Sequence, residues 1–391
     1  MKRIVRGFYA IAEAVRLCRP NVICAYPITP QTEIVENLAE MYANGELDAE
    51  YITAESEFAA ASIVLGASAA GARVFTATSS QGLLLMTEVL FNAAGMRLPI
   101  VMVVANRSVS APLSIWNDHQ DSMTVRDAGI IQMHAESNQE AHDLIPLAYK
   151  VAEDKRVLLP FILNVDGFKL THAYEPVDLL SQEVVDSFLP PYDPVVKLST
   201  EKPVAMGCYA PPPYYMEFRV AMEHAMERAK KVMEEVFKEW SEIIGRDYGL
   251  HVSAEYCEDA EVVAIAMGSL VGLVRDVVEE MRKEGKKVGL LKIRTFRPFP
   301  AEEVREALKN ANKVIIFERS LSIGSDPPVT LEVKSALFGH SSPEIHSVVI
   351  GLGGRDIPRE QIVKVISEVY EGKVKPGKRY EGVKEFEEVI P

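Results

Sequence analysis

Apolar positions in the first half of the chain fall into short runs that alternate between two spacings. Residues 7–17 carry apolar side chains at helical spacing, and residues 22–28 form a continuous apolar run. Similar runs follow near 49–53, 73–78, 99–105 and 158–165, and helical segments near 57–71, 81–95 and 138–154 separate them. Apolar strands that alternate with helices predict an α/β fold with a parallel sheet covered on both faces. Such sheets bind ligands at the carboxyl ends of their strands.

The pattern changes in the middle of the chain. Seven prolines lie from Pro190 to Pro213, which indicates a linker or extended arm. A long amphipathic helix is expected over 215–244, and a second set of strands follows as EVVAIAMGS, KKVGLLKIRTF, KVIIFERS and HSVVIGLGG. Helices near 270–284, 301–311, 329–338 and 358–371 connect these strands. We therefore expect an α/β domain over 1–186, an arm and long helix over 187–245, and a smaller α/β domain over 246–391.

Composition excludes several classes of protein. The net charge of −14 comes without a concentrated Lys/Arg patch, which argues against nucleic acid as a partner. No run approaches eighteen apolar residues and the first residues form no signal segment, so we expect a cytoplasmic protein without a membrane partner. The four cysteines show no C-x-x-C spacing, so we expect no iron–sulfur cluster and no metal ligands on this chain.

An acidic residue opens an otherwise apolar helix in the stretch from Ile52 to Met86. Ser56 can cap this helix, and Glu57 falls in its first turn, where the helix dipole favours negative charge. The rest of the helix is almost entirely small or aliphatic, which is typical of a helix that packs closely against a neighbouring element or another subunit. Glu57 can therefore be a dipole-satisfying acid or a functional one.

Three other polar residues follow predicted strands. In Tyr26-Pro27-Ile28-Thr29-Pro30, we expect Thr29 to cap a helix whose first residue is Pro30, with the Thr29 hydroxyl at the ligand crevice. Gln81 lies beyond the third strand. Arg107 follows the fourth and precedes the polar loop SIWNDHQDSM; it can be a surface charge or a two-point carboxylate anchor. Gly268-Ser269-x-x-Gly272 favours a tight turn over a phosphate site because it lacks the full dinucleotide fingerprint.

Several long motifs, in order, resemble one enzyme family. AYPITPQTEIVE, AESEFAAASIVLGASAAGA, TATSSQGLLLM and IWNDHQDSM are similar to the α subunit of the pyruvate:ferredoxin oxidoreductases, within the 2-oxoacid:ferredoxin oxidoreductase family, and the likeness continues to GLGGRDIP. The resemblance implies a thiamine diphosphate-binding (pyrimidine-type) parallel-sheet domain followed by a smaller α/β domain like the transketolase C-terminal domain.

The resemblance also implies roles for individual residues. Glu57 would bond N1′ of the aminopyrimidine, Thr29 and Arg107 would contact the 2-oxoacid, and Pro27, Ile28 and Gln81 would join Glu57 in binding the cofactor. The reaction would convert pyruvate and CoA to acetyl-CoA, CO₂ and reduced ferredoxin. A branched-chain 2-oxoacid enzyme and a scaffold without chemistry are the alternatives.

Two features that such enzymes need are absent from this sequence. It has no G-D-G…N signature for Mg²⁺ and diphosphate, and no cysteine cluster for electron transfer. By resemblance, a β subunit brings the diphosphate and Mg²⁺, a ferredoxin-like δ subunit brings [4Fe–4S] clusters, and a γ subunit completes the assembly. The chain would thus hold half of an active site.

Overall fold

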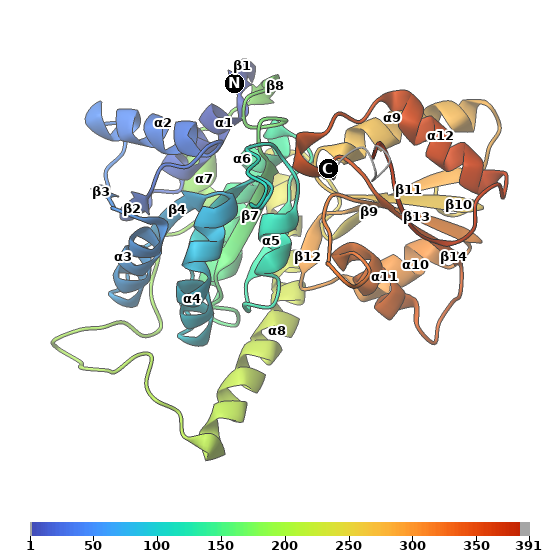
Figure 1. Ribbon diagram of the computed structural model, residues 1–391. Helices are drawn as coiled ribbons and strands as arrows, with labels where there is room; N and C mark the ends of the chain where they lie inside the picture. The colour runs from blue at the N-terminus through green and yellow to red at the C-terminus, as the bar shows by residue number, and fades with distance from the viewer. Residues whose placement is uncertain (1, 384–391) are drawn as a thin grey trace.

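The computed structural model describes residues 2–383 and contains two mainly parallel sheets, each covered by helices on both faces (Figure 1). The predicted α/β fold class is therefore confirmed. The first sheet has the strand order β12-β6-β7-β5-β4-β2-β3. Its strands are β2 (Val22–Ala25), β3 (Glu50–Thr53), β4 (Val74–Thr78), β5 (Val101–Asn106), β6 (Ile131–His134), β7 (Phe161–Asp166) and β12 (Thr295–Arg297).

Alternate residues of these strands point into two separate cores. Val101 and Val103 of β5 belong to one core, and Met102 and Val104 belong to the other. This alternation follows from the two-residue period of a strand. The first core is formed with α1 (Gly7–Leu17), α2 (Thr32–Ala43) and α6 (Asn138–Glu153), and the second with α3 (Glu57–Ala69) and α4 (Ser80–Gly95).

The second sheet has the order β15-β14-β13-β10-β11-β9, with β9 antiparallel at its edge. Its strands are β9 (Val252–Glu255), β10 (Val262–Ala266), β11 (Val288–Ile293), β13 (Lys313–Glu318), β14 (Glu344–Val349) and β15 (Gly377–Tyr380). One face packs on α9 (Leu270–Lys283) and α12 (Arg359–Tyr370), and the other on α10 (Ala301–Leu308) and α11 (Pro328–Leu337). A short 3₁₀ turn, η1 (Leu352–Gly354), follows β14.

Between the sheets the chain forms the predicted extended arm and long helix. The arm loops away from the first sheet and leads to the start of α8 (Pro212–Ile244), which begins at the bottom of the view in Figure 1 and rises toward the two sheets. Trp240 of α8 is buried, and its indole nitrogen donates to the Asp143 carbonyl of α6 at 2.7 Å. The C-terminal half of α8 therefore completes the first core. A small antiparallel pair, β1 (Lys2–Arg6) and β8 (Tyr174–Asp178), and the helices α5 (Gln120–Thr124) and α7 (Gln182–Phe188) complete this part.

The prediction of one strand in KKVGLLKIRTF is wrong. The segment forms β11 in the second sheet and then β12, which pairs antiparallel with β6 of the first sheet. The buried Arg294 lies between the two strands, and its carbonyl accepts from His134 N at 2.8 Å. Strand propensity is continuous across this segment, and pairing with a distant strand divides it. The predicted domain boundaries stay predictions. β12 falls in the predicted domain over 246–391, but it pairs with the sheet of the predicted domain over 1–186.

No helix within residues 2–383 is both long enough and apolar enough to cross a membrane.

Candidate functional site

The residues singled out in the sequence follow four neighbouring strands of the first sheet. Glu57 comes after β3, Thr29 after β2, Gln81 after β4 and Arg107 after β5, and the sheet places these strands side by side in the order β5-β4-β2-β3. From β2 the chain runs outward to β3 and then returns to β4 on the other side. The strand order thus reverses at β2, and ligands of open α/β sheets bind at such a switch point.

Glu57 is the first residue of α3, as predicted. The Ser56 hydroxyl caps the helix by accepting from Ala59 N at 3.1 Å. The Glu57 side chain is only 9% exposed, yet within residues 2–383 it makes no hydrogen bond or ion pair. Its neighbour Glu55 is exposed. A nearly buried carboxylate without a partner is the kind of group that a ligand completes.

The first turn of α4 lies directly against Glu57. A β-carbon placed on Gly82 would lie 2.7 Å from Glu57 Oε1 and 2.4 Å from Thr78 Oγ1, so only glycine fits there. Thr78 Oγ1 is buried without a hydrogen-bond partner in the described residues, and so is Gln81 Nε2. The Gln81 oxygen accepts from Ser80 Oγ, which leaves its nitrogen as a free donor. A carboxylate, a hydroxyl and an amide nitrogen are thus left unpaired where three strands meet α3 and α4, and such a polar set fits an aminopyrimidine ring.

The predicted capping role of Thr29 is wrong. Residues 29–31 form a turn in which Gln31 N donates to the Ile28 carbonyl at 2.8 Å, and α2 begins only at Thr32 with Gln31 as its N-cap. The Thr29 side chain is exposed, and its carbonyl accepts from Arg107 Nη1 at 2.9 Å. The turn keeps this carbonyl outside the helix and available to Arg107.

Arg107 is buried, and a second bond orients it. Its Nε donates to the Ser114 carbonyl at 3.1 Å, and the side chain is 7% exposed. Burial lowers the pKa of the guanidinium, and no carboxylate of residues 2–383 pairs with it. The structure therefore brings Thr29 and Arg107 together and leaves the Arg107 charge to be matched by an anion.

Pro27 and Ile28 lie in the loop that follows β2. Pro27 is exposed and Ile28 is half-buried, with Ile28 N donating to Gln31 Oε1 at 3.3 Å. The Gln31 side chain is fully buried, and its nitrogen has no partner among the described residues. The loop is thus positioned beside the other predicted residues, with one more unpaired donor beneath it.

A buried carboxylate under the site was missed in the sequence. Asp121 Oδ2 accepts from the backbone nitrogens of Ser80 at 3.0 Å and Arg107 at 2.9 Å, and Oδ1 accepts from Asn106 Nδ2 at 2.9 Å. Burial raises the pKa of Asp121 to about 6, although the hydrogen bonds from Asn106, Arg107 and Ser80 oppose this. Asp121 thus fixes the start of α4 relative to the start of the Arg107 loop. The signal was the density of polar residues in IWNDHQDSM, whose burial requires internal hydrogen bonds.

The second half of the chain supports the same loop. Asp118 Oδ2 accepts from Gly353 N at 3.0 Å, and the Asn117 carbonyl accepts from Gly354 N at 2.7 Å. Gly354 has φ +72°, and a β-carbon there would lie 2.3 Å from Trp116 Cβ. GLGG therefore packs directly on the loop that carries Ser114, a partner of Arg107.

The start of α9 is occupied by a carboxylate of the first sheet. Asp166 Oδ2, at the end of β7, accepts from Ser269 N at 2.9 Å and from Arg319 Nη1 at 2.7 Å. Gly268 has φ +62°. The predicted tight turn is confirmed, because the backbone donor that a phosphate would use is already bonded.

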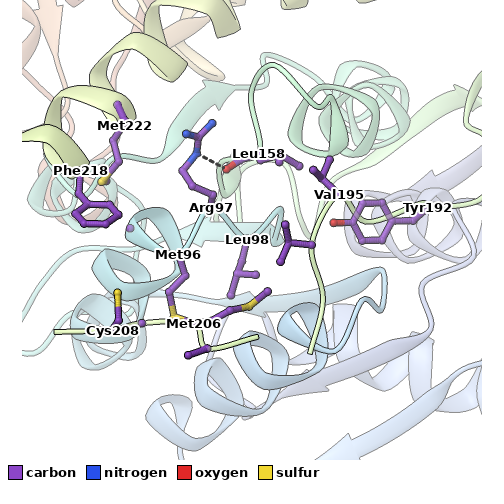
Figure 2. A pocket seen from close by; sticks show the side chains of 15 residues that line it. Met96, Arg97, Leu98, Leu158, Tyr192, Val195, Met206, Cys208, Phe218 and Met222 are labelled. Carbon is purple, nitrogen blue, oxygen red and sulfur yellow. Dashed lines mark hydrogen bonds between the residues drawn. The ribbon is translucent and has the colours of Figure 1, made fainter. Parts of the chain in front are cut away.

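A separate cavity of about 410 Å³ lies at the amino ends of the strands of the first sheet, opposite the site described above (Figure 2). It opens between the end of α4, the arm and the start of α8, and Arg97 donates to the Leu158 carbonyl at its wall. Residues 95–98 precede β5 and Leu158 precedes β7, so the cavity is at the amino ends of these strands. It has no part in the site described above.

Comparison with known proteins matches both halves of the chain. Residues 13–238 match the family described as pyruvate flavodoxin/ferredoxin oxidoreductase, thiamine diphosphate-binding, and residues 260–362 match pyruvate:ferredoxin oxidoreductase core domain II. The pyruvate synthase subunit PorA of Methanosarcina barkeri is 50% identical over 93% of this chain and 92% of its own length. The ketoisovalerate oxidoreductase subunit VorA of Pyrococcus horikoshii is 47% identical over 97% of this chain and 96% of its own.

A solved structure shares the fold. The 2-oxoglutarate:ferredoxin oxidoreductase from Magnetococcus marinus, with 2-oxoglutarate, coenzyme A and succinyl-CoA bound, superposes with a TM-score of 0.72 at 20% identity. The match covers 94% of this chain, which spans 65% of the length of that one. Together with the two family matches, the 50% identity to a relative along nearly its whole length shows that this chain belongs to the pyruvate:ferredoxin oxidoreductase family.

Proposed function

We propose that this chain is the α subunit of a pyruvate:ferredoxin oxidoreductase, which oxidatively decarboxylates pyruvate with CoA to acetyl-CoA, CO₂ and reduced ferredoxin. The 50% identity to a pyruvate synthase subunit along nearly its full length carries this proposal. The site supports it, because within residues 2–383 a buried carboxylate without a hydrogen bond and a buried guanidinium without a salt bridge lie at the switch point of the sheet.

Glu57, Thr78 and Gln81 would hold the aminopyrimidine of thiamine diphosphate, beside the loop of Pro27 and Ile28. Thiamine diphosphate, when bound, would supply a thiazolium centre that stabilises negative charge on the carbonyl carbon of the 2-oxoacid. Glu57 would share a proton with the ring nitrogen N1′, and the apolar small residues of α3 would exclude water from this bond. Gly82 lets the Glu57 carboxylate approach the start of α4.

Arg107 would bind the carboxylate of the 2-oxoacid. Thr29 and Ser114 hold its Nη1 and Nε through their carbonyls, so the guanidinium is oriented before substrate arrives. The exposed Thr29 hydroxyl would contact the substrate near its reacting carbonyl. Ile115 and Trp116, which are 38% and 51% exposed on the same loop, would help to sort the substrate side chain.

Partner subunits would complete the active site. A β subunit would bring the diphosphate site and Mg²⁺, a ferredoxin-like δ subunit would bring [4Fe–4S] clusters, and a γ subunit would complete the assembly. Exposed apolar side chains next to the site support this proposal: Phe58 follows Glu57 on α3 with 41% exposure, and Leu85 lies one turn after Gln81 on α4 with 49%. A protein surface that covered them would also close the site to water.

The test of the proposed function is an assay of the co-expressed complex. Ferredoxin or viologen-dye reduction with CoA should show the highest kcat/KM for pyruvate in a panel that includes 2-oxoisovalerate and 2-oxoglutarate. The alternative, a branched-chain enzyme, has its own support in the VorA relative at 47% identity, and preference for 2-oxoisovalerate would establish it. No turnover of any 2-oxoacid by a fully assembled, cofactor-loaded complex would favour the scaffold instead.

The isolated chain should bind thiamine diphosphate poorly, because it lacks the diphosphate and Mg²⁺ signature. Titration calorimetry with thiamine diphosphate and Mg²⁺ measures this directly, with the co-expressed complex as the positive control. Tight one-to-one binding by the chain alone would contradict the shared site. The cytoplasmic location stays a prediction, which fractionation of the source cells tests.

A further inference from the structure

Three potential metal ligands meet where α8, the start of β9 and α10 come together, away from the site described above. Glu234 lies on α8, His251 precedes β9, and Glu303 is in the first turn of α10. One ligand atom from each lies within 4.8 Å of the others. The three residues are far apart in the sequence, so their spacing gave no signal, and no metal ligand was expected on this chain.

His251 provides the feature that points to a ligand. Its side chain is 4% exposed, and Nε2 is buried without a hydrogen-bond partner in the described residues. This atom faces the acids, with Nε2 4.0 Å from Glu234 Oε1. The carbonyl of Lys230 lies near the ring but does not reach it with hydrogen-bond geometry.

The other ring nitrogen fixes the orientation of the imidazole. Nδ1 is 3.1 Å from Thr295 Oγ1, and the His251 carbonyl accepts from the backbone nitrogens of Arg294 and Thr295 at 2.9 and 3.1 Å. When Nδ1 donates to the threonine, the lone pair lies on Nε2. Metal-binding histidines are commonly held in this way by a hydrogen bond at the second nitrogen.

We propose that Glu234, His251 and Glu303 bind a divalent transition metal ion, best matched by Zn²⁺. Zn²⁺ binds both imidazole nitrogen and carboxylate oxygen, often with three protein ligands and water in the fourth position, whereas Mg²⁺ and Ca²⁺ prefer oxygen alone. Ligand atoms of a tetrahedral Zn²⁺ lie about 3.4 Å apart. Atoms that now lie within 4.8 Å of one another would therefore approach by up to about 1.4 Å. The Glu234 side chain is 53% exposed, which gives it room to close on the ion.

Lys230 forms an ion pair with one of the three proposed ligands, Glu303. Lys230 lies one helical turn before Glu234 on α8. Its ammonium is 2.9 Å from Glu303 Oε2 and 3.8 Å from a carboxylate oxygen of Glu302. A bound cation would repel it, and its side chain is partly exposed, so it can turn to solvent. The bound ion would then tie α8, which completes the first core, to α10 of the second sheet.

The test is titration of the chelator-treated full-length chain with ZnCl₂ by calorimetry. The wild-type chain should bind one Zn²⁺ that His251→Gln and Glu303→Gln each weaken by at least about tenfold. Lys230→Met should tighten binding by about tenfold, because it removes a like charge next to the ion. His224→Ala, which changes an exposed histidine on the same helix, is the matched control and should bind as the wild type does.

A second measurement keeps the proposal testable if one variant is unstable. Zn²⁺ should raise the Tm of the wild-type chain and of His224→Ala but not that of Glu303→Gln, and anomalous diffraction at the zinc edge should place the ion beside His251 Nε2. Millimolar or weaker Zn²⁺ binding, or equal binding by the wild-type chain and Glu303→Gln, would overturn the proposal.

Discussion

Glu57 and Arg107 lie at the carboxyl ends of strands in the first sheet as nearly buried ionisable side chains, and neither forms an ion pair within residues 2–383. Leaving such groups unpaired costs stability, and most proteins avoid it unless a ligand supplies the missing contact. The sequence identified both residues, because each follows a strand and each matches a family motif. It could not show that Asp121 holds the backbone of Arg107, since that contact depends on how a polar loop folds inward.

Replacement of Arg107 tests its role as the carboxylate anchor. Every 2-oxoacid carries a carboxylate next to the reacting carbonyl. Arg107→Ala should therefore lower kcat/KM for pyruvate and for 2-oxoisovalerate alike, by a factor that corresponds to about 2–5 kcal/mol. Arg107→Lys should restore only part, because an ammonium lacks the planar two-point geometry. Thr29→Val keeps the carbonyl that bonds Arg107 and should lower mainly kcat. A changed preference between the two substrates at nearly unchanged efficiency would make Arg107 a specificity residue instead.

The starts of α3 and α2 show what local sequence can and cannot predict. Ser56 caps α3 as predicted, because capping depends on residues three apart. The predicted start of α2 is wrong, because the Thr29 carbonyl is bound by Arg107, 78 residues away, and the turn at 29–31 intervenes. The division of KKVGLLKIRTF between two sheets was missed for the same reason. Contacts between distant residues decided both outcomes.

The start of α4 gives a prediction at this scale. Gly82→Ala should push on Glu57 and Thr78, with an overpacking cost of about 1–3 kcal/mol and a large loss of turnover in the complex. Gly66→Ala on α3 is the matched control: its β-carbon meets nothing within 4 Å, so the isolated chain should gain up to about 1 kcal/mol in unfolding free energy. Chemical denaturation measures both changes. A Gly82→Ala chain that is as stable and as active as the wild type would contradict the contact with Glu57.

The two sheets are held together by buried charges as well as by β12. Glu140 of α6 bonds Lys292 of β11 and Arg294, with Arg294 Nη2 at 2.9 Å from its Oε1. Burial alone would raise the pKa of Glu140, but Arg294 and Lys292 outweigh it and lower the value to about 2. These residues carried no signal in the sequence, because a Lys within an apolar strand gives no indication of its partner.

This cluster gives the molecule a predicted dependence on pH. The carboxyl pKa falls from 4.5 to about 2 on folding, so the stabilisation by Glu140 is fully present above pH 4.5 and is lost as the pH falls toward 2. Glu140→Gln should cost about 3–5 kcal/mol at pH 7, because it leaves two buried cations without their shared partner. The difference in unfolding free energy from the wild type should shrink between pH 4.5 and 3. An equal difference at both pH values would show that Glu140 does not act through its charge.

The most direct test of the central claim compares Glu57→Gln with Glu55→Gln in the co-expressed complex. The two acids are two residues apart, but Glu57 is buried beside Gly82 and Glu55 is exposed. A glutamine at position 57 keeps the size of the side chain and cannot share a proton with a ring nitrogen. If Glu57 acts on the cofactor, Glu57→Gln should assemble normally and lose pyruvate turnover by about 100-fold or more, while Glu55→Gln keeps nearly all of it. Near-normal turnover by an assembled Glu57→Gln complex would contradict the account.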